Sequence, residues 1–194
     1  MKTISLAAGK LHFTSDPHFY HSKMLGLRGH DSVEAMHDAM QHEWELSVRP
    51  TDTVIFLGDI SFAGTTLTVD VLSRFRSHKI LVRGNHDLGM SGAVLSLFDS
   101  VHDILSVKVQ DGEETQRIVC CHFPMLSWDQ QHRGAWMLHG HSHGSCQYPN
   151  PRPRILDVGV DSKLGFPISY AQVKAFMQLK APDVVTADHH KPLT

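Results

Sequence analysis

The sequence predicts an α/β fold, because short apolar runs typical of buried strands alternate with amphipathic helical patterns. In the first half, apolar runs at 11–15, 53–57 and 79–82 are separated by helical patterns at 32–47 and 68–77. Strands and helices of these lengths in alternation indicate parallel pairing through right-handed crossovers. The run at 53–57 is continuous and β-branched or aromatic, which is typical of a strand covered on both faces.

The helix predicted at 32–47 follows a capping pattern in which Asp31 precedes Glu34 by three residues. Its apolar side chains recur at helical spacing and should face the core. They are Val33, Met36, Met40 and Trp44. His37 and His42 lie in the same segment, and we expect both to be solvated.

The second half of the chain changes character. The segment 101–109 partly alternates and predicts one strand, which the turn pair Asp111-Gly112 joins to a returning strand at 117–121. Short strands are expected at 136–139 and 154–158.

A last helix is predicted to begin at Ser169, with Gln172 completing a capping box. The proline-rich segment 149–153 is expected to be a stiff surface loop. With 194 residues the chain fits a single domain, which we place at 1–180, followed by a flexible tail at 181–194.

Composition restricts the class of protein. The chain is 41% hydrophobic and 20% charged, with a formal net charge of -2, so it offers no strong nucleic-acid-binding or membrane surface. No run of 18 apolar residues predicts a transmembrane helix. Three cysteines, two of them adjacent, form no zinc or disulfide pattern. Together with a start that does not resemble a signal peptide, they predict a cytoplasmic protein.

Five short segments place metal-binding side chains where a predicted strand runs into a loop. They are Asp16-Pro17-His18, Gly58-Asp59, Gly84-Asn85-His86-Asp87, His122 and Gly140-His141-Ser142-His143. The polar residues of the first four segments each follow an apolar strand, so we expect them to leave the same carboxyl edge of one sheet, where open α/β sheets bind ligands. Carboxylate, amide and imidazole donors without thiolate suit manganese, iron or zinc.

The five segments, in this order, resemble those of the calcineurin-like metallophosphoesterase superfamily. The match covers about residues 10 to 175, and Trp128 together with segments 138–144 and 157–161 resembles a compact branch of single-domain bacterial and phage phosphoesterases. The resemblance implies a central β-sandwich of two mixed sheets flanked by helices, in four layers, αββα.

The resemblance also implies two divalent metal ions, with manganese favoured over iron, zinc or nickel. Seven residues would hold them. Asp16, His18 and His143 would bind the first ion, Asp59 would bridge both ions, and Asn85, His122 and His141 would bind the second. His86 is implied as the catalytic general acid, although it could instead be a further metal ligand or a stabiliser of its loop.

The implied reaction is hydrolysis of a phosphate ester by attack of a metal-bridging hydroxide. A phosphodiester of small or nucleotide-like character is favoured, because Phe62 and Ala63 occupy the positions at which relatives acting on phosphoproteins carry Asp and Arg. No substrate-binding residue is assigned. Candidates are three cations and three aromatic residues, namely Arg28, Arg83, Arg133, Phe19, Tyr20 and Trp128.

Two other classes of function remain open. A catalytically silent, metal-containing protein that binds a phosphorylated ligand would need the same residues, but loss of catalysis commonly leaves gaps in the ligand set and none are visible. A mononuclear iron oxygenase would use His-x-Asp with a distant His, whereas this chain has Asp-x-His and surplus ligands.

Overall fold

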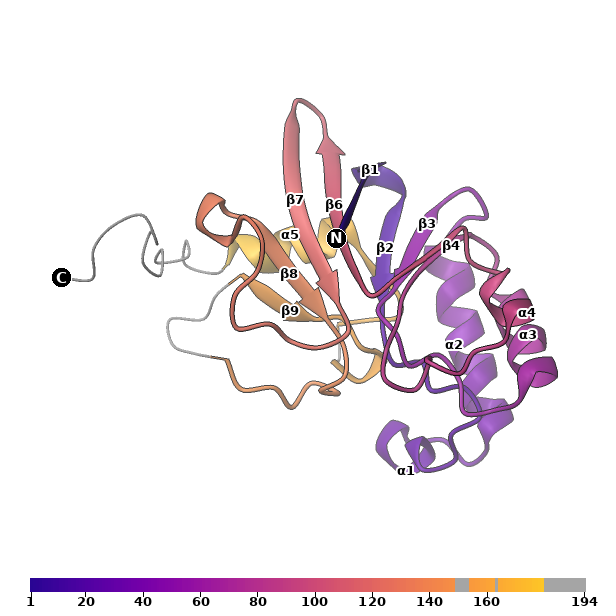
Figure 1. The fold of residues 1–194 in the computed structure, drawn as a ribbon. Helices are drawn as coiled ribbons and strands as arrows, with labels where there is room; N and C mark the ends of the chain where they lie inside the picture. Colours follow the sequence, from indigo (N-terminus) through magenta and orange to yellow (C-terminus); the bar gives the residue numbers. More distant parts are fainter. Residues whose placement is uncertain (149–153, 163, 180–194) are drawn as a thin grey trace.

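The computed structural model describes residues 1–148, 154–162 and 164–179. Two five-stranded sheets lie side by side (Figure 1), in the orders β1-β6-β7-β8-β9, called sheet A, and β10-β2-β3-β4-β5, called sheet B. The strands are β1 (Lys2–Ala7), β2 (Leu11–Thr14), β3 (Thr53–Phe56), β4 (His78–Val82), β5 (Ser100–His102), β6 (Ile104–Asp111), β7 (Glu114–Cys121), β8 (Trp136–His139), β9 (Ile155–Asp157) and β10 (Ile168–Ser169). Both sheets are mixed, because each contains one antiparallel pair among parallel ones.

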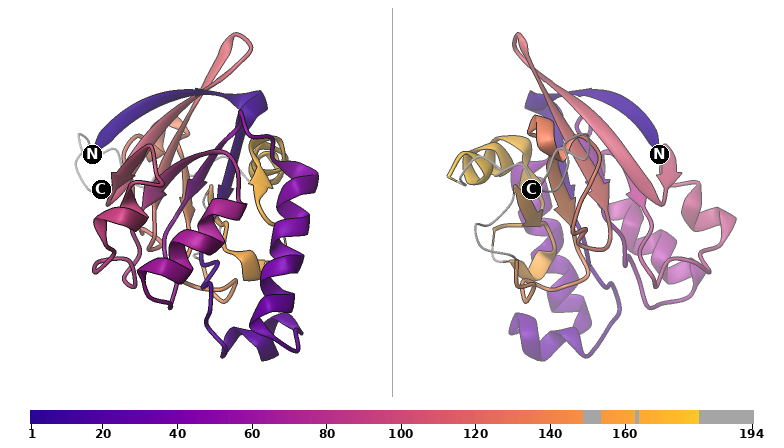
Figure 2. Two further views of the ribbon diagram at one scale, coloured as in Figure 1. Left: turned by 90° about the vertical axis from the view of Figure 1, so that its right-hand side faces the viewer. Right: turned by 60° about the vertical axis from the view of Figure 1, so that its left-hand side comes forward.

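Helices flank the two sheets (Figure 2). They are α1 (Met24–Arg28), α2 (Val33–Ser47), α3 (Thr65–Arg74), α4 (Gly92–Leu95) and α5 (Tyr170–Gln178), with single 3-10 turns η1 (Ala8–Lys10), η2 (Gln131–Arg133) and η3 (Val160–Ser162). Helices α2, α3 and α4 pack on the outer face of sheet B, and α5 packs its apolar side chains into the core between the sheets. The predicted class, two mixed sheets flanked by helices, is confirmed.

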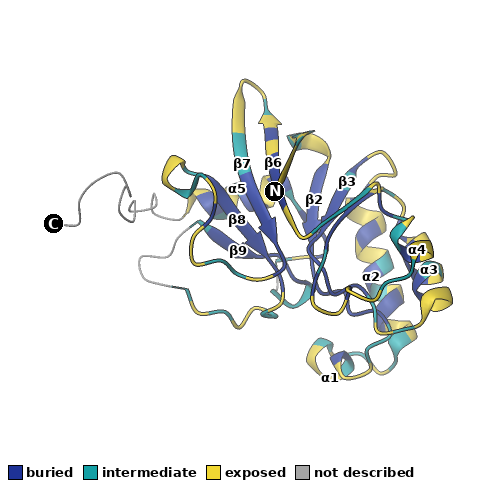
Figure 3. Ribbon diagram, in the orientation of Figure 1, coloured by how far each residue is buried: buried dark blue, intermediate teal, exposed yellow. Residues whose placement is uncertain are grey.

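Strand β3 shows why sheet B is apolar on both faces. Val54 and Phe56 pack toward the helices, whereas Ile55 and the following Leu57 point into the core shared with sheet A. Successive side chains of a strand alternate between its two faces, so a continuous apolar run serves two cores. The prediction that this strand is covered on both faces is confirmed, and Figure 3 shows the central strands as buried.

The outer face of sheet A is covered differently. Val119, Met137 and Ile155 lie against Trp128, which belongs to the segment between β7 and β8. Among the residues that the structure describes, this loop takes the place that a helix would have in a four-layer arrangement. Trp128 Nε1 donates a hydrogen bond to Ala135 O at 2.8 Å, which closes the loop on itself.

The single strand predicted at 101–109 is wrong, because the segment is divided between the sheets. Residues 100–102 form β5 at the edge of sheet B, and 104–111 form β6 in sheet A. Asp103, at the crossing, is exposed and pairs with Arg83 at 2.8 Å. Asp103 interrupts the alternation of apolar residues, and this interruption was the sequence signal that the chain changes sheets there.

Other boundaries differ at the helix starts. Helix α2 is capped by Ser32, whose hydroxyl accepts from Ala35 N at 3.0 Å, instead of by Asp31. Helix α3 begins at Thr65, three residues before the predicted start.

Strand β1 was not predicted, although Ile4 and Leu6 alternate with polar residues and pack against the core. The capping box of α5 at Ser169 and the turn at Gly112 are confirmed.

His37 was predicted to be solvated, and this is wrong: it is buried in α2 and its Nε2 accepts a hydrogen bond from Tyr20 N at 3.1 Å. The proline-rich segment 149–153 and the tail 181–194 lie outside the described residues. No helix within the described ranges is long and apolar enough to cross a membrane.

Candidate metal centre

All seven residues predicted as ligands follow a strand at its carboxyl end. They are Asp16 after β2, Asp59 after β3, Asn85 after β4, His122 after β7, and His141 and His143 after β8, with His18 two residues beyond Asp16. Asp16, Asp59, Asn85 and His122 were expected to leave the same edge of one sheet, and this is wrong for His122, which follows a strand of sheet A. Strands of sheet B lead to Asp16, His18, Asp59 and Asn85. Strands of sheet A lead to His122, His141 and His143.

The carboxyl ends of the two sheets are joined directly, which brings both sets of residues to one place. Ser15 forms an isolated parallel bridge with Gly159, beyond β9, and Val160 N donates to Ser15 O at 3.0 Å. His122 Nδ1 contacts Leu57 O at 2.6 Å, which ties the end of β7 to the end of β3. Sequence periodicity contains no information on this join.

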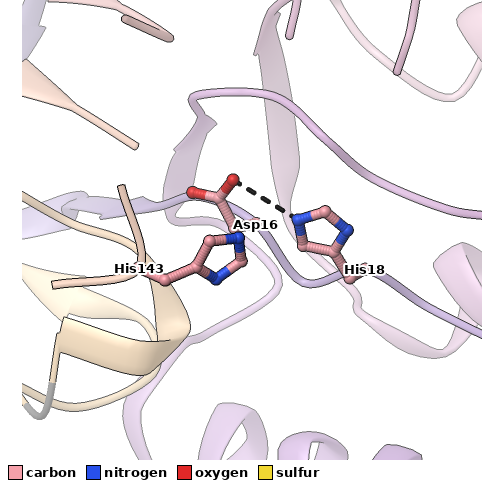
Figure 4. A group of neighbouring side chains, drawn as sticks. All are labelled: Asp16, His18 and His143. Carbon is pink, nitrogen blue, oxygen red and sulfur yellow. Dashed lines mark ion pairs between the residues drawn. The ribbon is translucent and has the colours of Figure 1, made fainter. Parts of the chain in front are cut away.

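Two groups of side chains result, each with one carboxylate and two imidazoles. Asp16, His18 and His143 form the first group, and Asp59, His122 and His141 form the second, with the candidate ligand atoms of each group within 4.8 Å of one another. Figure 4 shows the first group converging from two separate segments of the chain. Asn85 joins the second group, because its Oδ1 lies 3.1 Å from His122 Nε2.

Asp59 lies between the two groups. Its Oδ2 is 3.5 Å from His122 Nε2 in the second group and 3.8 Å from His18 Nε2 in the first. Its Oδ1 accepts a hydrogen bond from His86 N at 3.0 Å. Burial would raise the pKa of Asp59, but the contact with His122 and the His86 amide hold it below its ordinary value. Asp59 is therefore a carboxylate in reach of both groups.

The backbone at these residues is strained. Asp16, His18, Asp59, His141 and His143 all have φ between 47° and 67°, in the left-handed region. Non-glycine residues rarely adopt it, and such conformations cluster at functional sites. All five belong to the two groups of candidate ligands.

The first group has the features of an incomplete metal site. Asp16 and His18 are buried, and Asp16 Oδ1 and both ring nitrogens of His18 have no hydrogen-bond partner. Asp16 Oδ1 and His18 Nε2 lie 3.5 Å apart, within ion-pair distance but without a hydrogen bond. Buried polar atoms that lack hydrogen bonds are costly unless something satisfies them. A divalent cation would do so, and oxygen and imidazole donors are suitable ligands for it.

Two histidines are held in the tautomer that a metal requires. His122 Nδ1 contacts a carbonyl oxygen, which can only accept a hydrogen bond, so Nδ1 carries the proton. The other ring nitrogen, Nε2, then keeps the lone pair with which it could bind a metal ion. His143 Nδ1 lies 2.6 Å from Asp161 Oδ2, which has the same effect and raises the pKa of His143. Burial would raise the pKa of Asp161, but hydrogen bonds from His143 and Arg28 hold it well below its usual range.

Two buried aspartates support the site and were given no role from the sequence. Asp87 accepts from the amides of Gly84, Asp59 and Ile60 at 2.7, 2.8 and 3.0 Å, so it joins the loops after β3 and β4. Burial raises the pKa of Asp87, although the three amides act in the opposite direction. The only sequence signal for the supporting role of Asp87 was its position within one of the five segments, Gly84-Asn85-His86-Asp87.

Asp157 supports the loop that carries His141 and His143. It accepts from Ser142 Oγ at 3.1 Å and from the amides of Gly144 and Gly159 at 2.9 and 2.8 Å. Asp157 and Asp161 both lie in segment 157–161, which carried part of the family resemblance. That segment was the signal that could have found them.

The structure removes several candidates for substrate binding. Arg28 is buried and occupied by Asp161 and by the carbonyl oxygens of Asp16 and Pro17. Arg83 pairs with Asp103. Arg133 lines a separate cavity of about 240 Å³, together with Lys108 and Arg117. Of the aromatic candidates, Phe19 and Trp128 are buried and Tyr20 is partly buried.

His86 lies at the mouth of the centre. Its side chain is 45% exposed, and its Nε2 lies 3.9 Å from Asp59 Oδ2. It belongs to neither group of three. Its ring lies 4.6 Å from that of Phe62.

Comparisons with known proteins show which proteins the chain is related to. The Gene 66 protein of Mycobacterium phage D29 is 31% identical over 175 residues, which cover 77% of this chain and 87% of that protein. The chain belongs to the same family as this phage protein. An uncharacterised protein of Methanocaldococcus jannaschii is 26% identical over 161 residues, covering 78% of this chain and 82% of that protein. No family model matches the chain.

Among solved structures, AQ665 from Aquifex aeolicus, a protein of unknown function, superposes with a TM-score of 0.61. The superposition covers 86% of this chain and 98% of that chain, at 20% sequence identity. At this identity the likeness shows a common fold.

Proposed function

We propose that the protein is a dinuclear metal-dependent phosphoesterase that hydrolyses phosphodiesters of small or nucleotide-like character. The observation that carries the proposal is the position of Asp59, whose Oδ2 lies within 3.8 Å of an imidazole nitrogen from each of the two groups. A carboxylate shared by two three-residue groups is the arrangement needed to hold two ions side by side.

The residues present fit two divalent ions. Asp16, His18 and His143 would hold one, His122, His141 and Asn85 would hold the other, and Asp59 would contact both. Two ions held this way would supply activated water and positive charge for the phosphoryl oxygens. Two carboxylates against two divalent ions leave about +2, which suits a transition state gaining negative charge.

His86 is proposed as the proton donor. Its Nε2 is near Asp59 but outside both groups, and its exposed ring can reach a bound ester. In this role Nε2 gives a proton to the oxygen of the leaving alcohol as the ester bond breaks.

Phe62 favours a phosphodiester over a phosphoprotein substrate. An acidic residue and an arginine near this position would orient the proton donor and grip a doubly charged monoester. Here an apolar ring lies 4.6 Å from His86, and Ala63 follows it. A diester carries one negative charge fewer than a monoester, so it has less need of a cation there.

Metal loading and turnover test the proposal together. The protein is stripped with a chelator, reloaded with manganese, nickel or zinc, and its metal is counted by elemental analysis. We expect about two ions per chain, as in two-metal sites. We also expect faster hydrolysis of bis(p-nitrophenyl) phosphate than of p-nitrophenyl phosphate. A count of one ion, or turnover of neither ester by the loaded protein, contradicts the proposal.

A variant pair tests His86. His86→Ala should retain both ions and lose about 10²- to 10⁴-fold in kcat, with His42→Ala, an exposed histidine on α2, as the matched control. The loss should be larger for a diester with an alkoxide leaving group than for one releasing p-nitrophenolate, which needs little help from a proton donor. An equal loss on both esters would argue that His86 only supports its loop.

A further inference from the structure

Most aromatic side chains of this protein are buried, and Tyr20, Tyr148 and Phe176 are partly buried. The nine Phe, three Tyr and three Trp all lie within the described residues, and only Phe62 and Phe123 are exposed, at 41% and 46%. Both rings lie against histidines of the metal centre. An exposed large apolar side chain is ordinary on a protein surface, but two exposed rings confined to one site call for an explanation.

Phe62 lies beside the first group and the proposed proton donor. Its ring centroid is 5.1 Å from that of His18, with the planes 24° apart, and 4.6 Å from that of His86. The residue is fixed in place, because Phe62 N donates to Phe19 O at 2.9 Å in the bridge that joins Phe19 and Ser61.

Phe123 lies beside the second group. Its ring centroid is 4.7 Å from that of His141 and 5.0 Å from that of His122, both in edge-on arrangements. Each metal group therefore has one exposed ring against its imidazoles. The Phe62 ring also lies 4.0 Å from that of His21. With these histidine contacts in place, both rings still keep a large exposed fraction, which the contacts do not explain.

We propose that Phe62 and Phe123 form two stacking platforms for the nucleobases on either side of a scissile phosphodiester. This deepens the proposed function, on which it rests, by naming the substrate class: short, single-stranded nucleotide diesters. A diester has a substituent on each side of phosphorus, which matches one ring beside each group. Because Phe62 adjoins His86, it should stack the base of the leaving nucleoside, and Phe123 should stack the other.

The charge of the protein agrees with a short substrate. A formal net charge of -2 cannot supply affinity by neutralising many phosphates. Stacking on aromatic rings does not need such charge and works for any base. In a duplex the bases are already stacked on one another, so a single-stranded diester is the form that can splay its bases onto separate rings.

Kinetics on paired esters test the proposal in the manganese-loaded protein. Thymidine 5′-p-nitrophenyl phosphate and methyl p-nitrophenyl phosphate share a leaving group and differ in the base on the other side. Phe123→Leu should lower kcat/KM about 5- to 150-fold for the thymidine ester, the effect of losing one stacked base, and leave the methyl ester within about twofold. Phe123→Trp should keep the wild-type preference, and Leu126→Ala, an exposed neighbour, serves as the control.

Phe62 is tested on the leaving side, with thymidylyl-thymidine compared with the methyl ester of thymidine 5′-phosphate. Phe62→Leu should reduce turnover of the dinucleotide more than that of the methyl ester, and Phe62→Trp should restore the difference. If either Leu variant loses equally on both members of its pair, the rings only support the histidines. The platform proposal is then overturned, while the proposed esterase function stands.

Binding decides the proposal independently of turnover. The metal-loaded His86→Ala protein should bind thymidylyl-thymidine more tightly than dimethyl phosphate, and each added Phe→Leu substitution should reduce that preference. Equal affinity for the two diesters contradicts the platforms, even if the protein hydrolyses neither. Absence of turnover by the wild-type protein would instead contradict the esterase function.

Discussion

Arg28 and Asp161 form a two-point contact between residues 133 positions apart: Arg28 Nε lies 2.8 Å from Oδ1 of Asp161, and Nη2 lies 3.0 Å from Oδ2. Both side chains are only 6% exposed. Asp161 in turn holds His143, and Arg28 also binds the carbonyl oxygens of Asp16 and Pro17. This pair thus connects the loop after β2 to the turn after β9, behind the first metal group.

Removing the arginine should destabilise the fold. Arg28→Ala leaves the Asp161 carboxylate buried without its cation, and breaking a buried pair costs about 3–5 kcal/mol. Arg74→Ala removes an exposed partner of Asp70 and should cost about 0.5 kcal/mol or less. Urea unfolding of the metal-free proteins measures both. Equal losses in the two variants would show that the Arg28 contact contributes no more than a surface pair.

Asp161 should control metal affinity at the first group. Asp161→Asn keeps an acceptor for His143 but removes the negative charge that makes the imidazole a stronger ligand. Loss of such an outer partner typically weakens metal binding about 10- to 100-fold. Titration with manganese should show one weakened and one unchanged site, while Asp103→Asn, which alters an exposed pair, changes neither. Weakening of both sites alike would contradict a role confined to His143.

Gly140 should not accept a side chain. A Cβ at this position would overlap Ser15 Oγ and Asp16 Oδ2, the oxygen that accepts from His141 N at 2.9 Å. Gly140→Ala should cost about 1–3 kcal/mol as overpacking and weaken metal binding by moving Asp16.

Gly26→Ala, in α1, is the control for that substitution. It meets nothing within 4 Å and should be stabilising by about 0.4–1 kcal/mol. Unfolding and metal titration test both variants, and normal metal affinity in Gly140→Ala would contradict the close approach.

His37 should make stability depend on pH. Burial lowers its pKa below the ordinary value of 6.5, Arg74 and Arg28 act in the same direction, and Glu34 and Asp38 oppose them. The folded protein therefore holds His37 neutral, as an acceptor for Tyr20 N, while the unfolded chain takes up a proton more readily. This contribution to stability is complete above pH 6.5 and is lost as the pH falls toward the folded-state pKa.

Replacing His37 by glutamine isolates that contribution. The side chain of His37→Gln has an acceptor but does not titrate. Between about pH 7.5 and pH 5.5, the free energy of unfolding should fall more steeply in the wild-type protein than in the variant. The other histidines are common to both proteins and cancel in the comparison. Parallel curves would mean that His37 is protonated equally in the folded and unfolded states.

The sequence by itself determined the class of fold and the seven residues that the structure gathers at one place. Parallel β2, β3 and β4 follow from apolar runs separated by helical patterns, and the polar residues at their carboxyl ends are local features that a sequence displays directly. The family resemblance carried by the five segments then implied the division into two groups, and the structure forms two such groups, with Asp59 in the second and near the first.

Only the tertiary structure decided how these residues are supported and what faces the substrate. Arg28 was interpreted as a surface cation, but its side chain is buried. His37 was predicted to be solvated, but it is buried. Phe62 was noted only as a departure from the family pattern, and it is one of the two exposed aromatic rings. The physical reason is the same in each case. Whether a side chain is buried, and which partner it meets, depends on contacts between residues far apart in the chain, and local periodicity does not record them.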